Sequence, residues 1–202
     1  MNTFISEDKR ILVSSRFYIS VASHNSRVYA TNFNSGAIEI YGHNSDTWWG
    51  LRRIHRPFNN PDEIRLWVND KNIYISSWKH DSIFLFNHDG KPLVSYGNSG
   101  SCEAGQLNIP LLCHGDDDGD VLIADILNQG LQVLHSDGHF SVVNIQDMFR
   151  PQSAVYTPGR LYVLDEDPVS SKRSRILVYL PDQIKIENLE NEYEQIKITA
   201  VG

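Results

Sequence analysis

Acidic residues crowd one short segment of the chain, and closely spaced carboxylates are the ligands that Ca²⁺ prefers. The segment reads His114-Gly115-Asp116-Asp117-Asp118-Gly119-Asp120. A calcium-binding EF-hand loop requires alternating acids, a glycine at its sixth position and a bidentate glutamate at its twelfth, and this run lacks that spacing. Because Asp and Gly in this order are typical of a tight turn, we expect a solvated hairpin turn here.

Two further patterns could carry catalysis. Gly97-Asn98-Ser99-Gly100-Ser101 places a serine in a glycine-rich turn, but it lacks the second flanking glycine of a hydrolase nucleophile elbow. The eight histidines show no HExxH pair or other metal-ligand spacing. A metal-dependent hydrolase or lyase remains an alternative function, with Glu63 and His114 as its candidate ligands. We expect a non-enzymatic chain with no catalytic residue, metal or cofactor.

Four apolar runs open equivalent units of the sequence, at 27–30, 72–75, 120–123 and 160–163, and each is followed by a second run, at 37–41, 82–86, 130–134 and 175–179. The repeat is therefore about 45 residues long, in the range of propeller blades. The runs are short, rich in β-branched and aromatic residues, and bounded by Gly, Asn, Asp and Ser, which is typical of strands. These strands must position whatever site the chain carries.

The repeat predicts an all-β fold, a single β-propeller domain of four-stranded antiparallel blades, in which radial packing shields most sheet edges. We place the blades at about 17–56, 57–106, 107–149 and 150–190, with terminal strands at 9–14 and 195–201. Pro61, Pro110 and Pro151 mark the blade boundaries, where a missing N–H is tolerated. Six blades would need roughly 270 residues, so we expect an incomplete ring.

Charge and composition exclude several functions. The formal charge of −7 and pI near 5.5 disfavour duplex DNA, whose binding depends on clustered Lys and Arg. Cys102 and Cys113 form neither a zinc-type pair nor a disulfide framework, which favours a reducing compartment. The first residues carry charges where a signal peptide needs an apolar core, and no long apolar run follows. We expect a cytoplasmic protein without a membrane partner.

Two stretches resemble the NHL-repeat family of propellers. Residues 96–101 and 105–110 resemble a blade junction in which a Gly-rich loop leads through Gly-Gln-Leu-Asn to a proline. Residues 118–125 and 131–138 resemble the NHL core, with Asp-Gly turns and an Ala-Asp strand end. The resemblance covers about 18–180 and is strongest in the second and third repeats. It implies the substrate-recognition propeller of TRIM-type ubiquitin ligases, although this sequence contains no RING.

The meander geometry divides the loops between two ends of the propeller, because successive connections alternate between the ends of an antiparallel sheet. Loops between second and third strands share an end with the blade junctions. The candidate partner-binding residues at that end are Arg52, Arg53, His55, Arg56, Trp78, Lys79, His80, Arg150, Lys172, Arg173 and Arg175. Acidic residues share this end, and we expect the opposite end to be strongly acidic.

The leading functional prediction is a non-catalytic module that binds a protein at this mixed to basic rim, where Arg and Trp are typical of interaction hot spots. Single-stranded RNA binding on the same rim is the second prediction, since the resemblance permits it. The fourth repeat is longer between its second and third strands, and we expect a flexible loop over 165–174. Its serines, 170, 171 and 174, are alternative phosphorylation sites.

Overall fold

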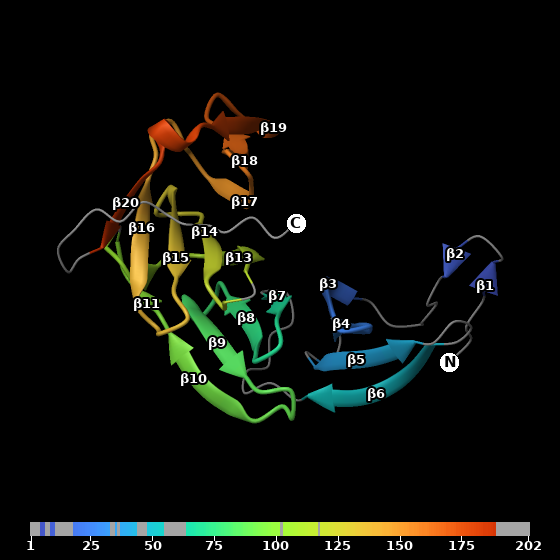
Figure 1. The fold of residues 1–202 in the computed structure, drawn as a ribbon. Helices are drawn as coiled ribbons and strands as arrows, with labels where there is room; N and C mark the ends of the chain where they lie inside the picture. The colour runs from blue at the N-terminus through green and yellow to red at the C-terminus, as the bar shows by residue number, and fades with distance from the viewer. Residues whose placement is uncertain are drawn as a thin grey trace.

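The computed structural model describes residues 5–6, 9–10, 18–32, 35, 37–43, 48–54, 64–101, 103–116 and 118–188. These residues form strands and turns, apart from the short 3-10 helix η2 (Pro181–Gln183). Four antiparallel sheets follow one another around a common axis, and the described strands leave the arc open between β17–β19 and β3–β6 (Figure 1). The predicted all-β propeller with an incomplete ring is confirmed.

Three blades contain the predicted four-stranded meander in chain order. Blade 1 contains β3 (Tyr18–His24), β4 (Arg27–Asn32), β5 (Ile38–His43) and β6 (Trp48–Ile54). Blade 2 contains β7 (Ile64–Val68), β8 (Ile73–Ser77), β9 (Ser82–Phe86) and β10 (Pro92–Tyr96). Blade 3 contains β13 (Pro110–Gly115), β14 (Val121–Asp125), β15 (Gly130–Leu134) and β16 (Phe140–Asn144).

Blade 4 differs because its sheet has three strands, β17 (Pro151–Thr157), β18 (Arg160–Asp167) and β19 (Ser170–Tyr179). The next strand, β20 (Lys185–Asn188), pairs with β16 and becomes a fifth strand of blade 3. Two small ladders complete the described structure: antiparallel β1 (Ile5–Ser6) with β2 (Lys9–Arg10), and parallel β11 (Asn98–Ser99) with β12 (Gln106–Leu107). The rest of the predicted terminal strands, 11–14 and 195–201, lies outside the described residues.

The four blades share one strand register, which explains why their sequences repeat. Equivalent positions of the second strands are occupied by Asn32, Ser77, Asp125 and Asp165. Each of these residues lies opposite the first paired residue of the first strand in its blade. Pro110 begins β13 opposite Asp125, and Pro151 begins β17 opposite Asp165. A proline is tolerated there because the strand is only starting and its ladder loses little.

The hairpin turns follow from their residue types. Asn87 Oδ1 accepts a hydrogen bond from Lys91 N at 2.8 Å, and Gly90 adopts φ +78° at the tip of the turn. Gly138 occupies the same place in the next blade, with φ +97° and its N–H donated to His135 O at 2.9 Å. Glycine is favoured at both positions because a side chain is strained at positive φ.

Apolar side chains fill the spaces between successive blades. One cluster joins blades 1 and 2 through Tyr29 and Ile75, and a second joins blades 2 and 3 through Leu85 and Ile123. The third lies between blades 3 and 4 and includes Leu131. Blades 2 and 3 therefore have both sheet faces buried against neighbouring blades, which is why their strands read as continuous apolar runs rather than as strict alternation.

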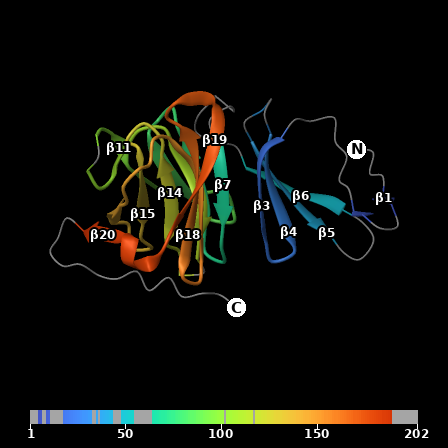
Figure 2. The same cartoon turned by 90° about the horizontal axis from the view of Figure 1, so that it is seen from above.

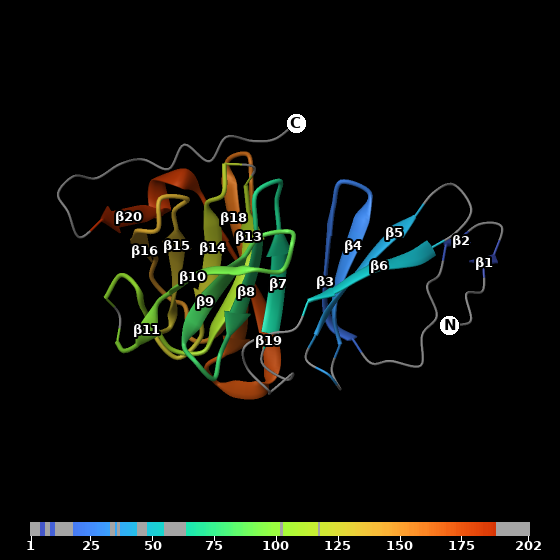
Figure 3. The same cartoon turned by 90° about the horizontal axis from the view of Figure 1, so that it is seen from below.

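The predicted flexible loop over 165–174 is instead a β-hairpin, because β18 continues to Asp167 and β19 starts at Ser170. The extra residues extend the ladder, with Glu166 opposite Ser174. This hairpin projects beyond the other loops at its end of the propeller (Figure 3), while the β3–β4 and β7–β8 turns lie at the other end (Figures 2 and 3). No helix in the described part of the chain has the length and hydrophobicity to cross a bilayer.

Candidate functional site

The structure assigns the candidate residues to the end formed by the β8–β9, β14–β15 and β18–β19 turns and the blade junctions, here called the junction end. The residues His55, Arg56 and Glu63 lie outside the described residues, and the side chains of Arg52 and Lys172 are not described. The remaining candidates form what we call the junction rim: Arg53, Trp78, Lys79, His80, Arg150, Arg173 and Arg175.

Arg53 is held by a buried carboxylate of its own blade. Its Nη2 lies 2.6 Å from Glu39 Oε1, and Glu39 is buried on β5. Tyr18 and Tyr41 donate their hydroxyls to Glu39 Oε2 at 2.8 and 2.7 Å. Burial, followed by the hydrogen bond to Glu39, raises the pKa of Tyr41 far above its ordinary value, so this phenol stays protonated. Arg53 therefore balances a charge that the blade has taken out of water.

Two arginines of blade 4 are paired in the same way. Arg175 Nη2 lies 2.8 Å from Asp165 Oδ2, and Asp165 is fully buried. The Asp165 carboxylate also accepts hydrogen bonds from Phe149 N and Arg150 N, which fixes the junction between blades 3 and 4. Arg150 Nη1 contacts Glu166 Oε2 at 3.3 Å. These arginines are half-buried structural cations as well as rim residues.

The β8–β9 turn presents an aromatic side chain in a fixed geometry. Trp78 is 39% exposed. The turn is closed by Ser77 Oγ and His80 Nδ1, 2.8 Å apart. At its end Asp81 adopts φ +46°, and its Oδ1 accepts a hydrogen bond from Ile109 N at 3.0 Å. The turn is thus tied to the following blade junction, which limits the entropy that Trp78 would lose on contacting a partner.

Lys79 and Arg173 are the exposed cations of the junction rim for which the described residues supply no ion-pair partner. Arg173 lies on the projecting β18–β19 hairpin, whose tip carries Val169 at 92% exposure. The junction end therefore combines exposed apolar groups, two cations with no ion-pair partner among the described residues, and three arginines that are already paired.

A buried carboxylate to which the described residues supply no cation lies at the junction end of blade 3. Asp125 accepts hydrogen bonds from Asn108 N at 2.7 Å, Asn128 Nδ2 at 2.8 Å and Gln132 Nε2 at 3.0 Å. Burial dominates these hydrogen bonds and raises the pKa of Asp125 to about 6. The group closes the β12–β13 junction, and its buried position gives it no access to a partner.

Blade 1 contains an equivalent carboxylate–amide pair, but the carboxylate and the amide are on exchanged strands. Glu39 is at the register position of Gln132, and Asn32 is at the position of Asp125. Asn32 Nδ2 lies 3.4 Å from Glu39 Oε1, so the amide and the carboxylate have changed strands. Sequence reasoning missed these networks, although the shared spacing of seven residues between the partners was a usable signal.

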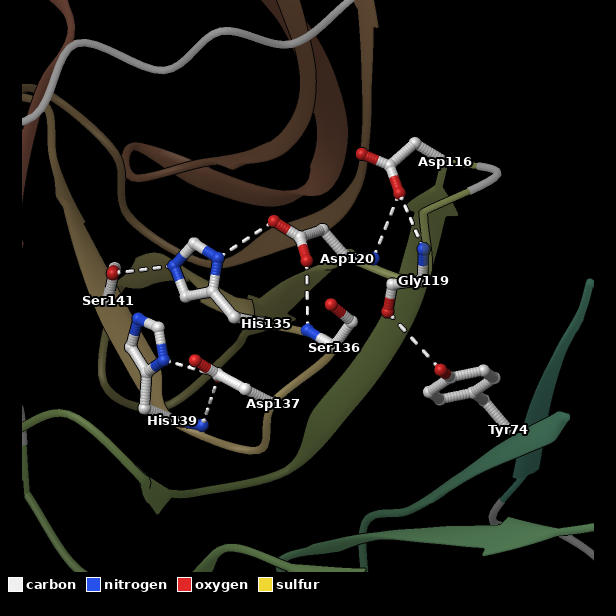
Figure 4. A network of polar contacts seen from close by, with 9 residues as sticks. All are labelled: Tyr74, Asp116, Gly119, Asp120, His135, Ser136, Asp137, His139 and Ser141. Atoms are coloured by element: carbon white, nitrogen blue, oxygen red, sulfur yellow. Dashed lines mark hydrogen bonds and ion pairs between the residues drawn. The ribbon is translucent and has the colours of Figure 1, made fainter. Parts of the chain in front are cut away.

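The end of the propeller opposite the junction end contains a histidine cluster that the sequence did not single out (Figure 4). His135 Nδ1 lies 2.7 Å from Asp120 Oδ2, and its Nε2 lies 2.7 Å from Ser141 Oγ. The ring of His139 stacks on His135 with centroids 4.1 Å apart, and its Nδ1 contacts Asp137 Oδ1. Hydrogen bonding from the His139 backbone, then from its side chain, lowers the pKa of Asp137.

The connectivity from Ser141 through His135 to Asp120 is that of a Ser-His-Asp triad, but its burial is reversed. A nucleophilic serine must meet its substrate, whereas Ser141 is fully buried on β16 and Asp120 is about one-third exposed. The chain of hydrogen bonds therefore fastens the β15–β16 turn to the β13–β14 turn. In that turn Asp116 Oδ1 accepts hydrogen bonds from Gly119 N and Asp120 N, both at 2.9 Å.

The alternative metal site gains no geometric support from the described residues. His114 lies exposed on the inner strand β13, and its proposed companion Glu63 is outside the described part. Within that described part, no group of three or more His, Cys, Asp or Glu side chains is arranged to hold a metal ion.

Comparisons with known proteins identify the fold. No protein-family model matches the chain, and no curated protein matches it significantly. A protein of unknown function from Bacteroides caccae has a TM-score of 0.60 at 16% identity, over 91% of this chain and 69% of that one. The Staphylococcus aureus virginiamycin B lyase has a TM-score of 0.54 at 12% identity, over 90% of this chain and 56% of that one.

A solved nidogen/laminin complex gives a TM-score of 0.58 at 12% identity, over 93% of this chain and 84% of that one. At these identities the similarity shows the fold alone. The lyase activity and the laminin complex belong to those proteins. What the comparisons and the strand order together show is that this chain folds as a β-propeller.

Proposed function

We propose that this propeller is a non-catalytic protein-interaction module whose junction rim binds a protein partner. The observation that carries the proposal is the composition of that rim. Trp78 supplies exposed apolar surface beside the exposed Lys79 in blade 2, and the β18–β19 hairpin of blade 4 adds Arg173 and, at its tip, Val169. A rigid aromatic anchor with nearby cations is the arrangement that protein-binding hot spots favour.

The charge balance of the rim favours a protein over single-stranded RNA. Glu39, Asp165 and Glu166 already neutralise three arginines. Further described acids share this end, including Asp81, Glu103, Asp147 and Asp167. A surface that tracks a phosphate backbone needs uncompensated cations along its length, because counterion release drives that binding. The described rim offers few of them.

The finer role follows from the sequence resemblance to NHL propellers. We infer that the module recruits substrates for ubiquitination, in the manner of the propellers of TRIM-type ligases, with ubiquitin transfer supplied by a RING elsewhere. The nidogen/laminin structure is named as a complex between proteins, which supports protein recognition by this fold. The function would act in the cytoplasm.

The test compares the wild-type chain with Trp78→Ala/Lys79→Glu. Its control, Leu93→Ala/Lys71→Glu, makes the same type of changes away from the rim, on β10 and in the β7–β8 turn. Proteins retained by each immobilised chain are quantified by mass spectrometry, and the leading partner is purified for direct titration. We expect the rim variant to weaken binding at least about tenfold and the control to match wild type.

Equal binding by the rim variant and wild type would refute the junction rim as the docking surface. A parallel titration uses a fluorescent single-stranded RNA at low and physiological salt. Tight RNA binding that falls steeply with salt and is lost in the rim variant would replace the protein proposal with the RNA alternative.

A further inference from the structure

The sheet face of blade 4 that points away from blade 3 is apolar and exposed. Two cross-strand rows form it. One row is Val155, Tyr162 and Val178, and the other is Ser153, Leu164 and Ile176. Ile176 is 70% exposed, Val178 47% and Leu164 41%. The face is well separated in function from the junction rim, because it lies on the flat of the sheet rather than at the loop end.

The same register positions in blade 3 form a blade–blade interface. Leu131, Val133 and Ala124 correspond to Ile176, Val178 and Leu164, because each set pairs at the same distance from its blade's buried aspartate. All three blade 3 residues are buried against blade 4. The blade 4 face therefore has the composition of a surface that another β-sheet covers.

The described side chains of blade 1 form no matching apolar face at the other end of the arc. Its face away from blade 2 exposes Val21, but it is centred on the Glu39 network, in which Tyr41 is buried and Arg53 is paired. A charged, already satisfied network is a poor complement to a row of aliphatic side chains, because burying it further requires desolvation without new partners.

The charges along β18 make the blade 4 face complementary to itself. Alternation on the strand gives Arg160, Tyr162, Leu164 and Glu166 on the outward side, so Arg160 and Glu166 flank the apolar pair. Glu166 already contacts Arg150 within its own chain, so Arg160 of the second copy would be a second cation beside this carboxylate. Consider a two-fold axis that runs across the strands, between the two rows. It places Arg160 opposite Glu166 of the second copy, and Tyr162 opposite Leu164 of the second copy. The same axis faces Ile176 with Val178 of the second copy, and Ser153 with Val155 of the second copy, so four of the six positions in the two rows form aliphatic or aromatic contacts and the Ser153–Val155 positions do not.

We propose that two copies of this chain associate through their blade 4 faces about this two-fold axis. The contact is isologous, since each copy contributes the same patch. It is a sheet-on-sheet packing of the kind that already joins blades 3 and 4 within one chain. The proposal does not depend on the junction rim, which stays open at the end of each propeller.

The decisive variant is Ile176→Lys, because this side chain is exposed in the single chain and its replacement leaves the fold intact. Its matched control is Leu93→Lys on the outer strand of blade 2, also an exposed aliphatic residue. Sedimentation velocity over a range of concentrations measures self-association. We expect wild type and Leu93→Lys to form dimers of similar affinity. Ile176→Lys should raise the Kd of the dimer at least tenfold.

A second pair of variants tests the axis. Arg160→Glu would face Glu166 of the second copy with a like charge and weaken the dimer. Arg27→Glu is the register-matched change on blade 1 and leaves association unchanged. A wild-type chain that stays monomeric would overturn the proposal. Hydrogen exchange that shows the blade 4 face of the monomer protected would then mean that another part of the chain covers this face. Dimerisation that survives Ile176→Lys would overturn it as well.

Discussion

The face of blade 3 that points toward blade 4 and the face of blade 4 that points away from blade 3 have similar sequences. The first is buried and the second is exposed. Leu131, in blade 3, is fully buried, whereas its register counterpart Ile176 is 70% exposed. Val133 is 8% exposed and its counterpart Val178 is 47% exposed. Apolar alternation along a strand therefore states that a face is suited to burial, while the presence of a neighbouring sheet decides whether it is buried.

The two blades also solve one electrostatic problem differently. Each buries an aspartate at the same register position of its second strand, and this aspartate holds the preceding junction. Asp165 has Arg175 as a counter-charge, whereas the described donors to Asp125 are all amides. Burial of an uncompensated carboxylate carries a desolvation cost, and the raised pKa of Asp125 expresses it. The Arg175 side chain at the rim therefore serves as the counter-charge of the buried Asp165.

The largest expected effect comes from truncating the covered member of the first pair. Leu131→Ala should lower the free energy of unfolding by about 2–5 kcal/mol, because it leaves a cavity between blades 3 and 4. Ile176→Ala should change it by less than about 0.5 kcal/mol at concentrations where the chain is monomeric. Urea unfolding followed by tryptophan fluorescence and circular dichroism measures both.

Concentration separates burial within one chain from burial between two. The Leu131→Ala effect should be the same at every protein concentration, whereas the Ile176→Ala effect should grow once the dimer is populated. If Leu131→Ala prevents folding, Leu131→Val supplies a milder cavity at about 1 kcal/mol. Equal costs for the two alanine variants in the monomer would contradict the assigned difference between the two faces.

The repeat predicted the propeller because strand identity depends on local pattern. The second strand of every blade falls on the apolar run that marked it, and Asp116 closes the turn that its spacing favoured. The continuation of β18 and β19 through 165–174 was mispredicted as a loop. Charged and serine residues there suggested a loop, but cross-strand pairing extended the hairpin despite their composition.

The candidate rim was only partly predictable. Meander geometry places the arginines at one end from sequence alone. It does not reveal that Arg53 faces Glu39, since that contact depends on which residues of β5 and β6 lie opposite each other. The switch of β20 to blade 3 is also invisible, because a short strand carries no mark of its partner. Non-local pairing is what single-sequence patterns leave open.

A smaller effect is the pH dependence that the Asp125 carboxyl gives to the free energy of unfolding. The folded-state pKa of Asp125, about 6, is above its ordinary value of 3.8, so the folded state binds the extra proton between these values. Its contribution to stability is fully present below pH 3.8 and is lost as pH rises through about 6. Two pKa units correspond to at most about 3 kcal/mol.

Chemical unfolding at pH 4.5 and pH 7 tests this contribution. Wild type should lose more stability between the two pH values than Asp125→Asn, in which the titrating group is absent. Asp182→Asn, at an exposed position in η2, controls for the general change in net charge. A pH dependence that is identical in wild type and Asp125→Asn would show that Asp125 does not titrate in this window.

The smallest effect is local and concerns the sheet edges. Blade 3 has its outer strand β16 covered by β20, with Val143 opposite Ile186, whereas no described strand pairs with the outer edge of β19. Ile186→Pro removes one backbone N–H and should detach β20, which makes blade 3 resemble blade 4. Hydrogen exchange should then accelerate at the β16 amides that point toward β20, while those that point toward β15 stay protected. Ile186→Ala keeps the backbone N–H and should leave this pattern unchanged. If both variants accelerate the same amides equally, strand pairing does not account for the protection, and the edge contrast between the blades loses its basis.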